Sequence, residues 1–213
     1  MDWIWANRAE LVSLTLAHAW LSAVPVLVGL AVAVPVGWWV SRHRRIGSVL
    51  LGIGSAVYTV PSLALFVLLP SVIGTPLLSP LNVVVALSLY AVALLIRTAV
   101  DAFAAVPDAV LDAATAAGYS PAGRGLRVEL PLAGPVLLAG TRVASFSTVS
   151  LVSVGAIIGV SSLGSLFTDG FRRDFTTEIV VGVVGTVLLA VIFDLILVRF
   201  GRLLMPWTAE ARA

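Results

Sequence analysis

Three ionisable side chains stand inside strongly apolar stretches of the sequence. Asp194 lies in the run Val-Ile-Phe-Asp-Leu-Ile-Leu-Val, and Arg97 and Arg142 lie in two other apolar runs. A charge is costly in apolar surroundings, so such a residue pairs with an opposite charge, carries protons or binds a polar ligand. We expect Asp194 to pair with Arg142 or Arg97. For Arg97, an ion pair with Asp101 and extension to the edge of the apolar layer are alternatives.

The chain lacks the residue types that most catalytic and cofactor sites need. The chain has no cysteine, and all 13 of its basic residues are arginine. A P-loop requires lysine, so ATP-driven activity would need a partner subunit that binds the nucleotide. With His18 and His43 as the only histidines, metal and nucleophile constellations are missing, and we expect no cofactor. Basic residues are not interleaved with aromatic ones, so we expect no nucleic-acid partner.

A second set of residues could line a polar path. The segment from Tyr58 to Ser62 places Pro61 in an apolar run, where proline frees a backbone carbonyl from its helical hydrogen bond. Irregular backbone inside a membrane is tolerated only against protein or a cavity. In a later apolar stretch, small residues recur every four positions up to Thr148, and Ser145 stands beside them. Close helix packing is one interpretation, and a translocation path through these five residues is the other.

Helices that cross a bilayer must position these residues. The chain has 213 residues, of which 60% are hydrophobic and 11% charged, a balance typical of membrane proteins. A crossing helix needs about 20 mainly apolar residues, and five stretches meet this requirement. We therefore predict an all-α membrane protein with five transmembrane helices in a single domain, residues 1–213. The predicted spans are residues 16–40, 46–69, 81–100, 132–160 and 179–204.

The distribution of arginine sets the expected orientation, because cytoplasmic loops carry an excess of positive charge. The loop after the first span holds three arginines, the loop between the third and fourth spans holds Arg124 and Arg127, and the C-terminal tail adds three more. The loop between the second and third spans has no charge. We predict a multi-pass protein of the cytoplasmic, or inner, membrane with its N-terminus outside and its C-terminus inside.

The most polar stretch of the chain is residues 101–131, between the third and fourth spans. Pro107 suits the first position of a helix, and Gly118 suits a left-handed helix end. Ser120, followed by proline, suits the N-cap of a second short helix. The sequence therefore predicts a helix, a glycine break and another helix. The first helix carries Asp112 among alanines. Because alanine side chains are small, this helix could insert closely into a groove on another protein.

The spacing in this loop resembles the coupling signature of permease subunits of ABC importers. That signature reads Glu-Ala-Ala, a glycine, and Ile-x-Leu-Pro; here Asp112 replaces the glutamate and Val128 replaces the isoleucine. The resemblance implies a cytoplasmic loop, residues 101–131, that docks on an ATPase subunit. The alternative is an amphipathic connector between two membrane helices. The implied coupling residues are Asp112, Ala113, Ala114, Gly118, Leu130 and Pro131.

Other segments resemble permeases of osmoprotectant importers, which take up glycine betaine, carnitine, choline and similar compounds. Residues 60–65 resemble the segment Ile-Pro-Ser-Leu-Ala-Leu of those permeases. Residues 90–97 are similar to Tyr-Ala-Leu-Leu-Pro-Ile-Leu-Arg, although leucine replaces the proline. Residues 128–144 resemble Val-Glu-Leu-Pro-Leu-Ala-Leu-Pro-Val-Ile-Leu-Ala-Gly-Ile-Arg-Thr-Ala closely. In residues 158–164, two serines replace glycines of the family. The resemblance covers most of residues 10–207.

This resemblance implies the type I, MetI-like core of small importer permeases and a function in ATP-driven import of osmoprotectants. The implied partners are two ABC ATPase subunits, a second permease subunit, an extracytoplasmic substrate-binding protein and membrane lipid. The chain itself would not be an enzyme. An importer permease for another small solute, such as an amino acid, remains an alternative. An ion-coupled secondary transporter with Asp194 as its relay is another, although the sequence shows no internal inverted repeat.

Overall fold

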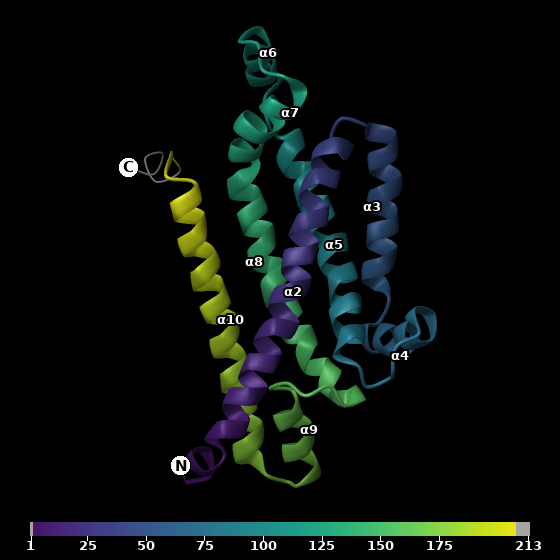
Figure 1. The fold of residues 1–213 in the computed structure, drawn as a ribbon, viewed down its shortest axis with the longest axis vertical. Coiled ribbons are helices and arrows are strands. Elements are labelled where there is room, and N and C mark those ends of the chain that lie inside the picture. The colour runs from purple at the N-terminus through teal and green to yellow at the C-terminus, as the bar shows by residue number, and fades with distance from the viewer. Residues whose placement is uncertain (1, 208–213) are drawn as a thin grey trace.

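A computed structural model describes residues 2–207, and all regular elements within that range are helices (Figure 1). The prediction of an all-α fold is therefore confirmed. The elements are α1 (Asp2–Ala6), α2 (Arg8–Val40), α3 (Arg44–Thr59), α4 (Ser62–Ile73), α5 (Pro80–Ala104), α6 (Asp108–Ala116), α7 (Pro121–Arg124), the π-helix η1 (Gly125–Glu129), α8 (Leu130–Gly155), the 3-10 helix η2 (Ala156–Ile158), α9 (Ser165–Arg172) and α10 (Thr176–Leu204).

Long apolar helices run along the long axis of the molecule (Figure 1). Within residues 2–207, four segments are long and apolar enough to cross a membrane: α2, α5, the segment Pro121–Ile158 that includes α8, and α10. The pair α3 and α4 meets the same criterion only when its two helices are taken together. The first helix, α1, and the C-terminal end of α10 lie at opposite ends of the bundle (Figure 1).

The stretch predicted as the second span, residues 46–69, is two helices. The α3 and α4 axes are bent by 103° at the break between them. Pro61 has no N–H, and it restricts the preceding Val60 to extended backbone with ψ at 130°. The hydroxyl group of Tyr90 donates a hydrogen bond to the Val60 carbonyl that the break leaves free. As a result, α4 lies across one end of the bundle instead of continuing α3 (Figure 1).

The contact between α2 and α5 is the most extensive in the bundle. Glycines of α2 face alanines of α5: a Cβ atom on Gly29 would lie 2.8 Å from the Ala91 Cβ, and Gly37 faces Ala99 in the same way. Small residues let the two backbones approach closely, as in other membrane helix pairs. We call these four residues the α2–α5 seam.

At the other side of the bundle, α10 is the least buried long helix. It packs against α9 and α8, but only 11% of its most apolar window is buried within the chain. Its remaining surface is strongly apolar, with a mean hydropathy of 2.8 in that window. A surface of this kind suits lipid or another membrane helix.

Candidate functional site

The polar loop forms a projection at one end of the bundle, with α6 at its tip (Figure 1). The helix ends as the sequence predicted, because Gly118 adopts a left-handed conformation with φ at 85°. The Gly118 N–H donates to the Thr115 carbonyl at 3.0 Å, and the Tyr119 N–H donates to the Ala114 carbonyl at 3.1 Å. These bonds satisfy carbonyl groups that would otherwise lack partners at the end of the helix.

The second helix of the loop begins at the predicted cap. The Ser120 hydroxyl oxygen accepts a hydrogen bond from the Gly123 N–H at 3.2 Å, and Pro121 occupies the first helical turn. Four residues later α7 passes into η1, and η1 passes directly into α8. Because no turn interrupts this helical path, a movement of α7 would be transmitted directly to a long membrane helix.

One face of α6 is open and the other is held against the protein. Asp112 and Ala113 are exposed, whereas Ala114 is only 8% exposed. The open face consists mainly of small side chains, and Asp108 and Asp112 are the charged residues of the helix. The predicted coupling residues are thus divided. Four lie in α6 and at its end, while Leu130 and Pro131 lie in the first turn of α8, inside the base of the projection.

Glu129 was not among the predicted site residues, but the structure places its carboxylate at the centre of a polar cluster. The side chain is 3% exposed. It accepts hydrogen bonds from Arg124 Nε at 3.0 Å, from Trp38 Nε1 at 3.1 Å and from the guanidinium of Arg42. The Arg42 guanidinium also lies over the Trp38 ring, 4.2 Å from its centroid. We call these four residues the Glu129 cluster.

The Glu129 cluster connects the projection to two membrane helices. Arg124 Nη1 donates to the hydroxyl oxygen of Thr115 in α6 at 2.9 Å. A continuous polar chain therefore runs from α6 through Arg124 and Glu129 to Arg42, just after the end of α2. Charge-assisted hydrogen bonds are the strongest class of such contacts, so this chain is a stiff link. One sequence signal was available, because Glu129 is a single acid between arginines at the edge of an apolar run.

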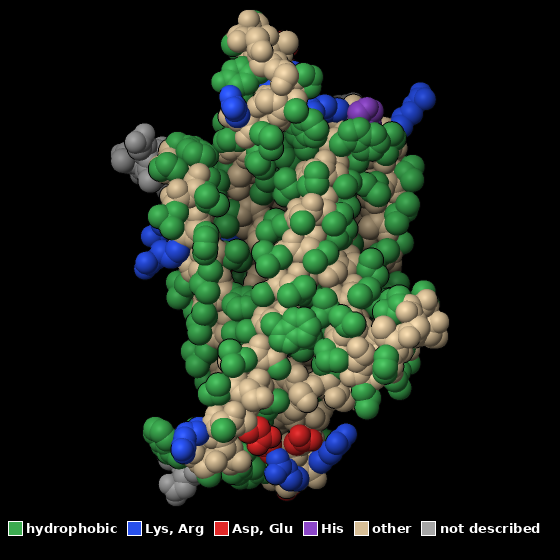
Figure 2. Space-filling model, viewed as in Figure 1, with side chains coloured by type: hydrophobic (Ala, Val, Ile, Leu, Met, Phe, Trp, Pro, Cys, Tyr) green, Lys and Arg blue, Asp and Glu red, His purple; other side chains and the backbone are tan. Residues whose placement is uncertain are grey.

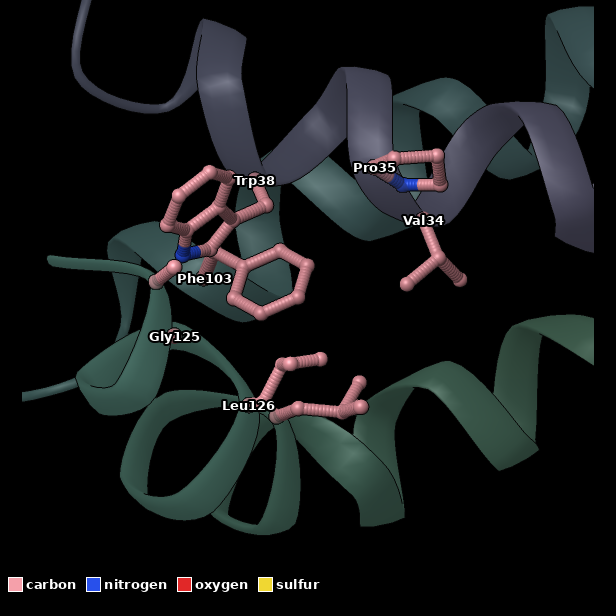
Figure 3. A pocket seen from close by; sticks show the side chains of 8 residues that line it. Val34, Pro35, Trp38, Phe103, Gly125 and Leu126 are labelled. Atoms are coloured by element: carbon pink, nitrogen blue, oxygen red, sulfur yellow. The ribbon is translucent and has the colours of Figure 1, made fainter.

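An apolar cavity of about 360 Å³ lies beside the Glu129 cluster, between α2 and η1 (Figure 3). A Cβ atom on Gly125 would lie 2.6 Å from the Trp38 ring, so glycine is what allows η1 to approach the indole. The cavity is open on one side, and the polar cluster beside it joins Arg124 of α7 to Arg42, just after the end of α2, through Glu129. The lining residues are Val34, Pro35, Trp38, Phe103, Ala122, Gly125, Leu126 and Leu130.

The five predicted path residues fall into two groups. Tyr58 and Pro61 are exposed and Ser62 is partly exposed, all at the break between α3 and α4. Ser145 and Thr148 are each 4% exposed in α8, and the Thr148 hydroxyl donates to a carbonyl of its own helix at 2.7 Å. In this conformation, therefore, only the first group borders open space. The second group lies where close helix packing would place it.

Arg142 of α8 and Asp194 of α10 form a bidentate ion pair. Arg142 Nε lies 2.5 Å from Asp194 Oδ1, and Arg142 Nη2 lies 2.9 Å from Asp194 Oδ2. Arg97 does not join this pair; it lies on α5 and forms no ion pair among residues 2–207. Since each charge of the pair satisfies the other, the contact fastens α10 to α8, which favours a structural role over proton transfer.

The Arg142–Asp194 pair gives a testable prediction. Asp194→Asn should lower the melting temperature of the detergent-extracted protein, because it leaves the Arg142 charge without its partner. Replacing both residues with leucine should restore most of the loss, since neither charge then remains. Asp169→Asn is the matched control, because Asp169 is 48% exposed and 3.8 Å from Arg172. An unchanged melting temperature with altered transport would contradict the structural role.

The chain is similar in sequence to known transport proteins over most of its length. Residues 26–210 match the family described as binding-protein-dependent transport system inner membrane component. The osmoprotectant import permease protein OsmW of Salmonella typhimurium is 31% identical over 203 residues, covering 94% of each chain. The glycine betaine/carnitine/choline transport system permease protein OpuCD of Bacillus subtilis is 30% identical over 190 residues, covering 89% of this chain and 82% of the relative.

The fold is similar to that of a solved structure of the MetNI methionine ABC transporter in an inward-facing conformation. The TM-score is 0.82 at 20% identity, and the match covers 93% of this chain and 98% of that one. The MetI-like fold expected from the sequence is therefore confirmed.

Proposed function

The chain belongs to the family of binding-protein-dependent transport system inner membrane components, and we propose that it is the permease subunit of an ATP-driven importer of quaternary-ammonium osmoprotectants. Two relatives carry permease names that include osmoprotectant import or glycine betaine, carnitine and choline transport. Their alignments extend over most of both chains, so the likeness is not confined to the loop signature. As an inner-membrane component, the chain would depend on partner subunits for ATP hydrolysis.

The proposed orientation puts α6 on the cytoplasmic side. An apolar band covers the middle of the molecule (Figure 2). In this view, the end that bears α6 displays arginines, whereas the opposite end displays acidic groups beside arginines (Figure 2). If α3 is counted as a short crossing, the chain crosses five times, with the N-terminus outside and the C-terminus inside. The excess of arginine near α6 supports this orientation.

The observation that carries the proposal is the projecting α6 joined by a polar chain to the membrane helices. We propose that the open face of α6, with Asp112 and Ala113, inserts into a groove of an ATPase subunit. Displacement of α6 would pass through Thr115 and Arg124 to Glu129. From there it would reach α2 through Arg42, and it would reach α8 directly through the unbroken helical path.

The proposed assembly has two permease subunits, two ATPase subunits and an extracytoplasmic binding protein that delivers the substrate. We propose that the break between α3 and α4, with Tyr58, Pro61 and Ser62, borders the translocation path. The binding protein would select quaternary ammonium compounds, which aromatic side chains can hold. The ion-coupled alternative is less well supported, because its candidate relay, Asp194, is already bound to Arg142.

The coupling proposal predicts that Asp112→Lys reduces recovery of the ATPase subunit at least about tenfold, since it reverses a charge on the docking face. Co-purification from membranes that contain all subunits measures this. Asp169→Lys is the matched control, because it makes the same change in α9, at the other end of the bundle. Gly118→Val should also weaken association, because valine strains the left-handed helix end. Undiminished association of Asp112→Lys would refute the docking face.

A further inference from the structure

A hollow of about 460 Å³ opens between α3, α5 and α8. This volume lies in the usual range for small-ligand pockets. Its walls are mostly apolar and carry a few polar side chains, as is typical of sites that orient a ligand. The polar residues are Ser55, Tyr58, Thr59, Arg97 and Thr98. Two of them, Tyr58 and Arg97, differ from the rest because one presents an aromatic ring and the other a full charge.

Arg97 brings an uncompensated charge to this hollow. Its side chain is exposed, and among residues 2–207 it forms neither an ion pair nor a hydrogen bond. Arg142 of α8 is instead bound to Asp194. A guanidinium within a membrane helix is costly unless something polar meets it. Its planar donors fit a carboxylate through two parallel hydrogen bonds.

Tyr58 brings an aromatic ring to the same hollow. The residue is 44% exposed, and its ring contacts the Tyr90 ring edge to face, with centroids 5.6 Å apart. Tyr90 is itself fixed, because its hydroxyl group donates to the carbonyl of Val60 at the helix break. The Tyr58 ring is therefore held in place beside the hollow. A tyrosine face attracts quaternary ammonium groups.

We propose that this hollow is a substrate site for zwitterions that carry both a quaternary ammonium group and a carboxylate. The carboxylate would bind Arg97, and the ammonium group would contact Tyr58. The hollow would therefore favour betaines over choline, which has no carboxylate and is repelled by the guanidinium. The inference rests on the proposed function and adds a selectivity step, within the permease, to the one in the binding protein.

The test uses the complete transporter in proteoliposomes, with radiolabelled glycine betaine and choline as the two probes. Arg97→Gln should lower glycine betaine uptake at least about tenfold, the effect of losing a charged hydrogen-bond pair, and leave choline uptake within about twofold. Arg97→Lys should recover part of the loss, because it keeps the charge. The binding protein is the same in each preparation, so its own preference cancels between variant and wild type. Arg202→Gln is the control for charge removal in α10.

Three outcomes would overturn the inference while leaving the proposed function intact. Uptake of both probes could fall in parallel, which would indicate a structural role for Arg97. Neither uptake could change, which would indicate that Arg97 only extends to the membrane surface. Wild-type protein could accumulate choline but not glycine betaine. If the wild-type complex accumulates neither probe, the proposed function fails first and the inference fails with it.

Discussion

Glu129→Gln is expected to reduce substrate uptake at least tenfold while ATP hydrolysis by the assembled complex continues. Glutamine preserves the shape of the side chain but removes the charge that Arg42 and Arg124 share. Removing one partner from a buried ion pair commonly costs about 3 kcal/mol, and the side chain here is 3% exposed. The link from α6 to α2 would then be weakened at its centre, beside a cavity that offers no replacement contact.

The ratio of ATP hydrolysed to substrate transported measures this uncoupling in proteoliposomes. Glu10→Gln is the matched control, because Glu10 is exposed near the start of α2. A double variant, Glu129→Gln with Arg42→Gln, should lose little more than Glu129→Gln alone if the cluster acts as one unit. Near-normal coupling in the Glu129→Gln complex would show that the Glu129 cluster does not transmit the motion.

Gly29→Leu is expected to cause the largest loss of stability, because it separates the two helices that share the most extensive contact. A Cβ atom at Gly29 would lie 2.8 Å from the Ala91 Cβ and 3.1 Å from its backbone carbon. A flexible side chain cannot relieve the contact with backbone. Overpacking usually costs about 1–3 kcal/mol, and at this site we expect a value near the upper end or beyond it.

Thermal unfolding and the yield of monodisperse protein in detergent measure the effect. Gly52→Leu is the matched control: Gly52 lies in α3, and a Cβ atom there would meet nothing within 4 Å. The double variant Gly29→Ala with Ala91→Gly exchanges the small and larger residues across the α2–α5 seam. It should be more stable than Gly29→Ala alone. Equal melting temperatures for Gly29→Leu and Gly52→Leu would contradict the proposed close contact.

The features that the sequence predicted depend on local chemistry. The left-handed end at Gly118 and the cap at Ser120 follow from the residues themselves and their immediate neighbours. The apolar stretches were recognisable because the thickness of a bilayer demands helices of a certain length. A freed backbone carbonyl at Pro61 was also expected, but within one span, residues 46–69. The bend of 103° was not predicted, since the orientation of α4 depends on the helices beneath it.

The features that the sequence could not predict depend on partners far along the chain. Glu129 contacts Arg42 across 87 positions and Trp38 across 91, and no local pattern shows which helix end will face it. The partner of Asp194 remained open between Arg97 and Arg142, because the choice depends on which face α8 presents to α10. The surroundings of Ser145 and Thr148 likewise depend on the bundle, which buries both side chains.

The ion pair between α8 and α10 also has a consequence for how the protein is made. The last long helix is long and apolar enough to cross the bilayer, yet it takes a carboxylate with it. Until α8 lies alongside, that carboxylate stands in lipid without its arginine. Packing of α10 against α8 therefore satisfies both charges at once, and separating the two helices would leave each charge without its partner.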